Sequence, residues 1–407
     1  MQTNLPDDVR ATPRGREAES ILRSCVHCGF CTATCPTYLL LGDELDGPRG
    51  RIYLIKQALE GADVTTKTQL HLDRCLTCRA CETACPSGVT YGRLLDIGRA
   101  VVEERVPRAP GARLGRALLR AGLTGPFFAP LYRIGQSVRG LLPAGLRAKL
   151  LPRRPTGPWP TTRHARRVLF PAGCVQRAMA PGIDRAAARV LERIGIEVIR
   201  PTPAGGCCGA LRQHLGAAAA ALEEARRNID AWWPVIEAGA EAIVSTASGC
   251  GVMIKEYGHL LREDPHYAKK AARVSALTRD VSEVVRANVG ILATKLPARA
   301  AERLVVHAPC TLQHGQHLPG VVEGLLQSLG VEVRSVADSH LCCGSAGTYS
   351  LLQAELSKQL RDRKLAALEA PAPEVILSAN IGCIAHLSAG TSIPVRHWIE
   401  WLDARLG

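Results

Sequence analysis

The sequence predicts a multidomain protein in which a helical domain and a cationic linker precede a duplicated α/β domain with parallel sheets. A length of 407 residues fits two or three domains, and 46% hydrophobic residues suffice for buried cores. The 16 cysteines form two sets of eight, from Cys25 to Cys85 and from Cys174 to Cys383, and each half repeats internally. The expected domains are residues 1–107, 108–167, 168–300 and 301–407.

The number of cysteines indicates metal binding rather than a disulfide framework. The first ten residues contain no apolar leader, and no run of 18 apolar residues occurs, so we expect neither a secretory signal nor a membrane-spanning helix. A protein that is not exported keeps its thiols reduced, and clustered thiols then serve as metal ligands. We therefore expect a cytoplasmic location.

One cysteine motif occurs twice in the first half. Residues 25–36 read CVHCGFCTATCP, and residues 75–86 read CLTCRACETACP, at an offset of 50 residues. Apolar residues within 51–60, 71–74 and 94–104 recur at helical spacing, and no alternating strand pattern is present. The first domain is therefore predicted to be helical.

The spacing Cys-x2-Cys-x2-Cys-x3-Cys-Pro is that of bacterial ferredoxins, in which three thiolates bind one cluster and the fourth binds the other. We predict an α-helical ferredoxin-like domain with two [4Fe–4S] clusters. The ligands of the first cluster are expected to be Cys25, Cys28, Cys31 and Cys85, and those of the second Cys75, Cys78, Cys81 and Cys35. Two zinc sites are the alternative, although zinc does not need this threefold run twice. His27 is expected to be a polar neighbour of the first cluster and not a ligand. Two clusters that lie close together in this way pass electrons one at a time.

In the second half, short apolar runs alternate with helical patterns. Helical spacing occurs over residues 183–194 and 321–329. Strands are expected at 168–170, 196–199, 243–244, 304–306, 331–336 and 375–377. Strands that alternate with helices form parallel sheets.

The cysteines of the second half follow these strands. Cys174, Cys207, Cys208 and Cys250 recur as Cys310, Cys342, Cys343 and Cys383 at offsets of 133 to 136 residues. Open α/β sheets build their sites at the carboxyl ends of strands. Gly209 and Gly344 permit the left-handed backbone that lets adjacent thiols face one cofactor. Each repeat is therefore a possible site for a further iron–sulfur cluster, and buried structural cysteines are the alternative.

Two ferredoxin-type motifs followed by two Cys-Cys-Gly repeats resemble the iron–sulfur subunits of the heterodisulfide reductase/glycolate oxidase group. The amino-acid sequence is closely similar to that of glycolate oxidase (glycolate dehydrogenase) iron–sulfur subunits in six segments, which are residues 25–38, 42–56, 228–233, 247–251, 339–349 and 392–398. The resemblance covers nearly the whole chain and is weakest from Arg108 to Arg163.

The resemblance implies an oxidoreductase subunit that is not catalytic alone. Two partner subunits of the FAD-oxidase type would oxidise glycolate to glyoxylate, and this chain would pass the electrons to a membrane quinone or another acceptor. It would then be peripheral on the cytoplasmic face of the inner membrane. No G-x-G-x-x-G follows a predicted strand, so no flavin or nicotinamide site is expected in this chain. The alternatives are an iron–sulfur subunit of lactate or glycerol-3-phosphate dehydrogenase, or a self-sufficient disulfide-reducing enzyme.

One departure from the family pattern concerns the ends of the repeats. Heterodisulfide reductase repeats end in Cys-x-x-Cys, whereas Met253 and His386 stand at the last position here. The second repeat is the better candidate, because His386 can replace a thiolate at iron. His307 and His314 flank Cys310, where they are expected to act as neighbouring donors or as proton carriers for a quinone. The alternative is that these histidines only form hydrogen bonds with backbone carbonyl groups.

The positive charge is concentrated between the two halves. The chain has 51 Lys and Arg against 37 Asp and Glu, and 13 of the basic residues lie between Arg108 and Arg167 without an acidic one. The segment is expected to be a solvated linker, a contact with anionic lipid headgroups or a docking site for an acidic partner subunit. No nucleic acid is expected, because no recognition fold accompanies the charge.

Overall fold

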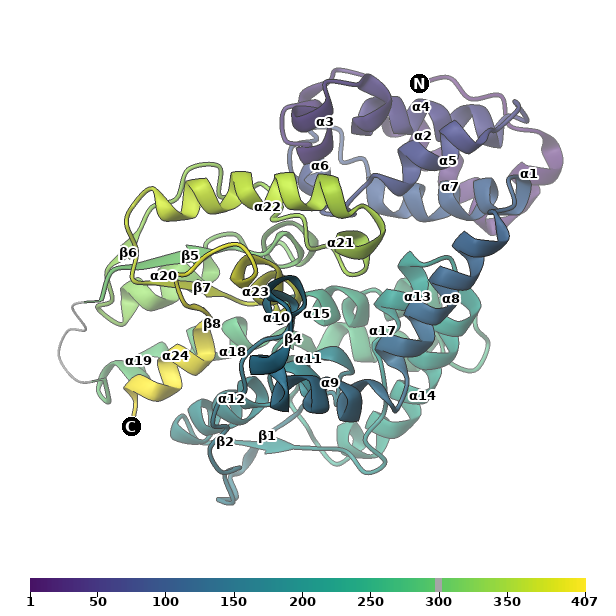
Figure 1. Ribbon diagram of the computed structural model, residues 1–407. Helices are drawn as coiled ribbons and strands as arrows, with labels where there is room; N and C mark the ends of the chain where they lie inside the picture. Colours follow the sequence, from purple (N-terminus) through teal and green to yellow (C-terminus); the bar gives the residue numbers. More distant parts are fainter. Residues whose placement is uncertain (297–301) are drawn as a thin grey trace. The chain divides into compact units, whose positions relative to one another are not determined.

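A computed structural model describes residues 1–296 and 302–407 (Figure 1). The chain divides into two compact units. The first comprises Met1–Ala117 with His340–Leu360, and the second Leu118–Ser339 with Arg361–Gly407. The boundary predicted at residues 300 and 301 lies outside the described residues.

The amino-terminal part of the first unit is helical, as the sequence predicts. Its helices are α1 (Asp7–Ala11), α2 (Pro13–Ser24), α3 (Pro36–Leu41), α4 (Pro48–Leu59), α5 (Thr66–Asp73), α6 (Ala80–Thr83) and α7 (Tyr91–Arg105). Three of them, α2, α3 and α4, begin at a proline, whose fixed φ suits the first helical position. Apolar side chains of α2, α4, α5 and α7 form one core.

The second unit contains two four-stranded parallel sheets. Strands β1 (Arg166–Leu169), β2 (Ile196–Ile199), β3 (Ala242–Ser245) and β4 (Thr278–Asp280) have the order β2-β1-β3-β4. Strands β5 (Leu304–His307), β6 (Val333–Arg334), β7 (Val375–Ser378) and β8 (Val395–His397) repeat this topology as β6-β5-β7-β8. The parallel duplicated α/β prediction is thereby confirmed. The two last strands, β4 and β8, were not predicted.

Helices connect these strands (Figure 1). In the first repeat they are α11 (Val175–Met179), α12 (Gly182–Arg193), α13 (Ala210–His214), α14 (Ala218–Glu237), α15 (Ser248–Lys255), α16 (Tyr257–Leu260), α17 (Ala268–Leu277), α18 (Val281–Ala287) and α19 (Val289–Ala293). In the second they are α20 (Val321–Ser328), α21 (Tyr349–Leu352), α22 (Ala354–Glu369), α23 (Ile381–Ser388) and α24 (Trp398–Arg405).

The segment predicted as a cationic linker contains three further α-helices, α8 (Pro110–Thr124), α9 (Phe128–Ser137) and α10 (Ala144–Lys149), and a 3-10 helix over Arg139–Leu141. Among the described residues, no helix is both long enough and apolar enough to cross a membrane.

The sheets place the cysteines of the second half after strand ends. Cys174 precedes α11 after β1, the Cys207–Cys208 pair follows β2, and Cys250 lies in α15 after β3. The second repeat has the same order, with Cys310 after β5 and Cys383 in α23 after β7. All 16 cysteines are free thiols.

Candidate metal centres

The two ferredoxin-type motifs share a backbone conformation that gathers their thiols. His27 and Gly29 have φ values of 56° and 86°, and the residues 50 positions later, Thr77 and Arg79, have φ values of 53° and 60°. Left-handed backbone is uncommon for residues other than glycine, so three such residues in matched loops indicate a functional constraint. Each loop therefore turns sharply twice within its Cys-x2-Cys-x2-Cys run.

The thiols assigned to the first cluster surround one cavity. Its lining includes Cys25, Cys28, Cys31 and Cys85, which come from both motifs, and also Cys81 and His27. Burial, together with the charge of the neighbouring Cys25, raises the pKa of Cys31 to about 11. Thiolates that are costly to form in such a place are stabilised by a bound metal. The four thiols and their cavity thus fit a [4Fe–4S] cluster.

The thiols assigned to the second cluster also lie close together. Burial raises the pKa of Cys81 well above its ordinary value, and the thiols that act on it electrostatically are those of Cys78, Cys75 and Cys35. The Tyr91 hydroxyl donates to Cys75 Sγ over 3.7 Å. A tyrosine donor beside a ligating sulfur is one of the contacts that tune cluster potentials.

A buried arginine accompanies this second set. The Arg51 side chain is 1% exposed, and its Nε donates to the His71 carbonyl oxygen over 2.7 Å. Its guanidinium is 3.3 Å from Asp46, a fully buried carboxylate that also pairs with Arg74 at 2.8 Å. Two arginines therefore share one carboxylate, which leaves a surplus of positive charge. Cys75 and Cys35 are among the groups whose charges raise the pKa of Arg51.

In the second unit, the first Cys-Cys-Gly repeat forms a thiol cluster. Cys174 Sγ and Cys207 Sγ are 3.4 Å apart, and the Gly209 amide donates to Cys207 Sγ over 3.4 Å. A hydrogen bond from Cys174 lowers the pKa of Cys207 and raises that of Cys174. Hydrogen bonds with Cys207 and Cys250 raise the pKa of Cys208. Of Cys174, Cys207 and Cys208, Cys207 is therefore the first to become a thiolate.

Gly209 has a φ of 93° and Gly344 a φ of 85°, which confirms the left-handed turns expected after both cysteine pairs. A Cβ at Gly344 would lie 2.6 Å from the Ser357 carbonyl oxygen, so no other residue fits there without a shift. The Gly344 amide donates to Cys342 Sγ over 3.4 Å, which matches the bond in the first repeat.

Two buried side chains that sequence reasoning missed hold the first cysteine pair. Asn228 Nδ2 donates to the Cys207 carbonyl oxygen over 2.8 Å, and the Tyr257 hydroxyl donates to the Cys208 carbonyl oxygen over 2.9 Å. A further 3.0 Å bond joins Asn228 to the Tyr257 hydroxyl. The only sequence signal was the position of Asn228 in the family-like segment 228–233.

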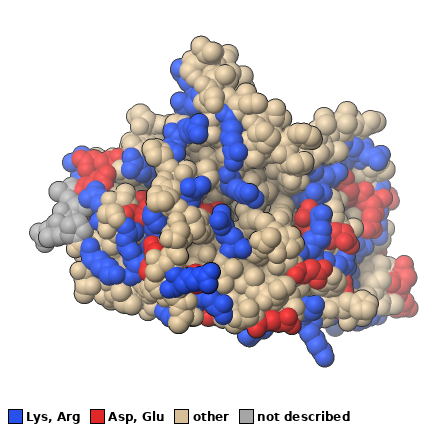
Figure 2. Space-filling view, turned by 90° about the horizontal axis from the view of Figure 1, so that it is seen from below, with Lys and Arg blue, Asp and Glu red and all other residues tan. Residues whose placement is uncertain are grey.

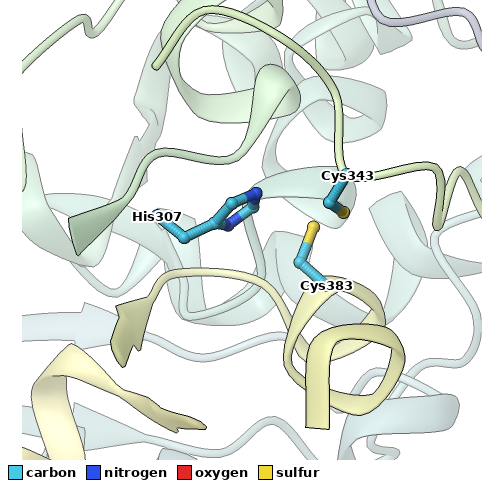
Figure 3. Close-up of side chains that lie close together, drawn as sticks. All are labelled: His307, Cys343 and Cys383. Atoms are coloured by element: carbon cyan, nitrogen blue, oxygen red, sulfur yellow. The ribbon is translucent and has the colours of Figure 1, made fainter. Parts of the chain in front are cut away.

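In the second repeat, His307 and Cys383 of the second unit each offer a ligand atom, and these two atoms lie within 4.8 Å of one another (Figure 3). His307 Nδ1 bonds to Ser378 Oγ over 3.0 Å, and its buried Nε2 has no hydrogen-bond partner among the described residues. Burial lowers the pKa of His307 to about 3, so the ring is neutral at physiological pH, as a metal ligand requires. His386, the histidine predicted for this site, is not a member of that group.

The fold and the thiol sites together define an iron–sulfur protein. Residues 21–89 match the model of the 4Fe-4S dicluster domain, and residues 168–255 and 304–388 match that of the cysteine-rich domain. The first match agrees with iron–sulfur ligation rather than the zinc alternative.

The chain belongs to the family of glycolate oxidase iron–sulfur subunits. It is 55% identical to the glycolate oxidase iron–sulfur subunit of Escherichia coli K12 over 100% of this chain and 99% of that protein. It is 30% identical to the probable glycolate oxidase iron–sulfur subunit of Bacillus subtilis 168 over 92% and 90% of the two chains. Lactate utilization protein A of Bacillus velezensis is 30% identical over 57% of this chain and 97% of its own length.

Proposed function

We propose that this chain is the electron-transfer subunit of a glycolate dehydrogenase complex. In this proposal, two FAD-bearing partner subunits oxidise glycolate to glyoxylate, and this chain carries the electrons to a quinone or another acceptor. The observation that carries the proposal is the arrangement of the ferredoxin-type thiols, with four from both motifs around one cavity. Similarity along the full length of a glycolate oxidase iron–sulfur subunit supports the choice of substrate.

The residues of the chain suit a carrier better than a catalyst. When bound, a [4Fe–4S] cluster supplies a one-electron carrier. Cys25, Cys28, Cys31 and Cys85 would hold the first cluster, and Cys75, Cys78, Cys81 and Cys35 the second. Tyr91 and Arg51 contribute a hydrogen bond and a buried positive charge beside the second set. These groups orient the ligands and set the electrostatics around them.

The cysteine-rich repeats are proposed to hold a further cluster. The 3.4 Å approach of Cys174 to Cys207 supports thiol ligation in the first repeat. In the second repeat, the unpartnered nitrogen of His307 supports imidazole as a ligand beside the thiols. A lactate dehydrogenase complex is the second candidate function, because lactate utilization protein A matches 57% of the chain.

The test is purification of the complex with flavin, iron and substrate assays on one sample. The chain alone should contain iron without flavin and should not reduce dye with glycolate. Addition of the flavin subunits should give dye reduction that depends on glycolate, with D-lactate and glycerol 3-phosphate compared under the same conditions. Dye reduction by the chain alone with glycolate would disprove the carrier role, and faster turnover of D-lactate by the complex would favour the second candidate.

A further inference from the structure

The outer face of α9 and α10 presents apolar side chains to solvent. These side chains, called the α9–α10 face, are between 39 and 87% exposed and belong to Phe127, Leu131, Ile134, Val138, Leu141 and Leu146. Four of them recur at positions 127, 131, 134 and 138, which is the spacing of one side of a helix. Contiguous apolar surface of this kind on a folded protein marks a binding site.

The inner side of the same segment forms hydrogen bonds with the chain that follows it. The Leu151 amide donates to the Tyr132 hydroxyl over 2.9 Å, and Gln136 Nε2 donates to the Leu151 carbonyl oxygen over 3.0 Å. Arg139 Nε donates to the Leu150 carbonyl oxygen over 2.8 Å. The exposed side chains therefore belong to an ordered amphipathic element, and their exposure is a property of the folded unit.

The segment of the chain that carries this face has charges of one sign. The segment from Arg108 to Arg167 has 13 basic residues and no acidic one. Some of these cations form ion pairs within the protein, since Arg108 and Arg116 both pair with Asp73. Among the described residues, the side chains of Arg133 and Arg153 have no hydrogen-bond or carboxylate partner. In the upper part of the face shown in Figure 2, Lys and Arg lie among uncharged surface with almost no Asp or Glu.

The two unpartnered arginines line one cavity of about 270 Å³. Arg154, Arg185 and the carboxylate of Glu400 also line it. Arg154 lies 3.9 Å from Glu400, and the Arg185 guanidinium donates to the Gly157 carbonyl oxygen over 2.8 Å. Buried apolar residues, including Ile183, contribute to its walls. Guanidinium groups bind phosphate oxygens in a bidentate manner, and apolar walls suit the hydrocarbon that adjoins the phosphate of a lipid.

We propose that the α9–α10 face docks on the surface of an anionic phospholipid bilayer, and that Arg133 and Arg153, which have no partner among the described residues, supply positive charge to its phosphates. The apolar side chains would enter the boundary between headgroups and acyl chains, as in interfacial amphipathic helices. A bilayer fits better than a protein partner, because lipid phosphates offer a uniform negative surface to a segment without acidic residues. The docking surface goes beyond the proposed electron transfer and does not depend on the identity of the substrate.

The experiment measures sedimentation of the full-length iron-loaded chain with vesicles. One set contains equal amounts of phosphatidylcholine and phosphatidylglycerol, and the other contains phosphatidylcholine alone. The charge variant is Arg133→Gln with Arg153→Gln, and the apolar variant is Leu131→Gln with Ile134→Gln. The matched controls are Lys269→Gln with Arg286→Gln, which removes two exposed charges elsewhere, and Ile291→Gln, which removes an exposed apolar side chain.

The wild type should bind the anionic vesicles and not the neutral ones. The charge variant should bind roughly 30-fold more weakly, because each basic residue near the surface contributes about fivefold. The apolar variant should lose about tenfold or more, and both controls should bind as the wild type does. Iron content reports folding, and if one variant loses iron, the other decides the test.

Binding that does not distinguish anionic from neutral vesicles would overturn the proposal, as would an equal loss in the controls. Variants that lose the flavin subunits but keep the vesicles would show that the face binds a protein instead. Dye reduction by the complex in solution should be unchanged in both variants, so failure of the docking proposal is distinguishable from failure of the carrier role.

Discussion

Removal of the buried cation beside the second set of ferredoxin thiols should lower the reduction potential of that centre. Arg51→Met keeps most of the side-chain volume but deletes the guanidinium that is 1% exposed and bonded to the His71 carbonyl oxygen and Asp46. A reduced cluster carries one more negative charge than an oxidised one, so a nearby positive charge stabilises the reduced form. Its loss therefore makes reduction harder.

The size of the effect follows from Coulomb's law. At an effective dielectric constant near 20, a unit charge about 8 Å away contributes about 2 kcal/mol, and 1.4 kcal/mol corresponds to about 59 mV for one electron. We expect the potential to fall by roughly 50–100 mV. Removal of one partner of a buried ion pair also costs about 3–5 kcal/mol of stability, so the variant should have a lower thermal midpoint. The other arginine on Asp46, Arg74, limits this loss.

The assay is a redox titration followed by electron paramagnetic resonance on the full-length protein. Asp46→Asn is the matched control of opposite sign, because it removes a buried negative charge and should raise the same potential. Arg51→Lys retains the charge and loses the planar fork, so it should shift the potential less than Arg51→Met. If Arg51→Met and Asp46→Asn both retain iron and shift the potential in the same direction, the electrostatic reasoning is refuted.

Three further outcomes are expected. Cys85→Ser should damage the cluster held by Cys25, Cys28 and Cys31, and a spectroscopic loss confined to the Cys75 motif would disprove the crossed assignment. Any iron beyond the roughly eight atoms of two [4Fe–4S] clusters should fall in His307→Ala and persist in His386→Ala, whereas the reverse result would favour the histidine expected from the sequence. Burial raises the pKa of Asp280 to about 6, so stability of about 3 kcal/mol is present below pH 4 and lost as the pH rises through 6. Asp280→Asn keeps a capping side chain for α18, and its thermal midpoint should fall less than that of the wild type between pH 5 and 7.5; an equal fall in both proteins would contradict this assignment.

The parts of the fold that the sequence predicted are those in which a local pattern has one physical meaning. The repeated Cys-Cys-Gly turns require left-handed glycine, and Gly209 and Gly344 have that conformation. Apolar runs bounded by helical patterns indicated six of the eight strands found in residues 1–296 and 302–407. The other two, Thr278–Asp280 and Val395–His397, span three residues each and place a charged residue at the centre, so no strand pattern is visible in them.

The sites also depend on contacts that no spacing reveals. Arginine is rarely buried, and Arg51 is buried only because Asp46, Thr37 and a carbonyl oxygen converge on it from other elements. His307 ends a buried strand, where Ser378 of the neighbouring strand holds one ring nitrogen. His386 has the sequence distance from Cys383 that the family pattern suggests, but it does not join the close ligand atoms of His307 and Cys383, and its role stays a prediction.

The two ferredoxin-type centres differ in their surroundings, and this difference bears on the direction of electron flow. In the first set, Cys28 is exposed, and the nearby cation Arg49 is paired with Glu44 at 2.6 Å. Solvent and the carboxylate of Glu44 therefore weaken the electrostatic effect of Arg49 on the first centre. The second set has the surplus positive charge of the buried Arg51 and the half-buried Arg74, and the hydroxyl of Tyr91. Both features stabilise a reduced cluster, so we expect the second centre to have the higher potential. Electrons that enter at the more exposed first centre would then pass to the second centre. Arg51 would determine the difference in reduction potential between the two centres.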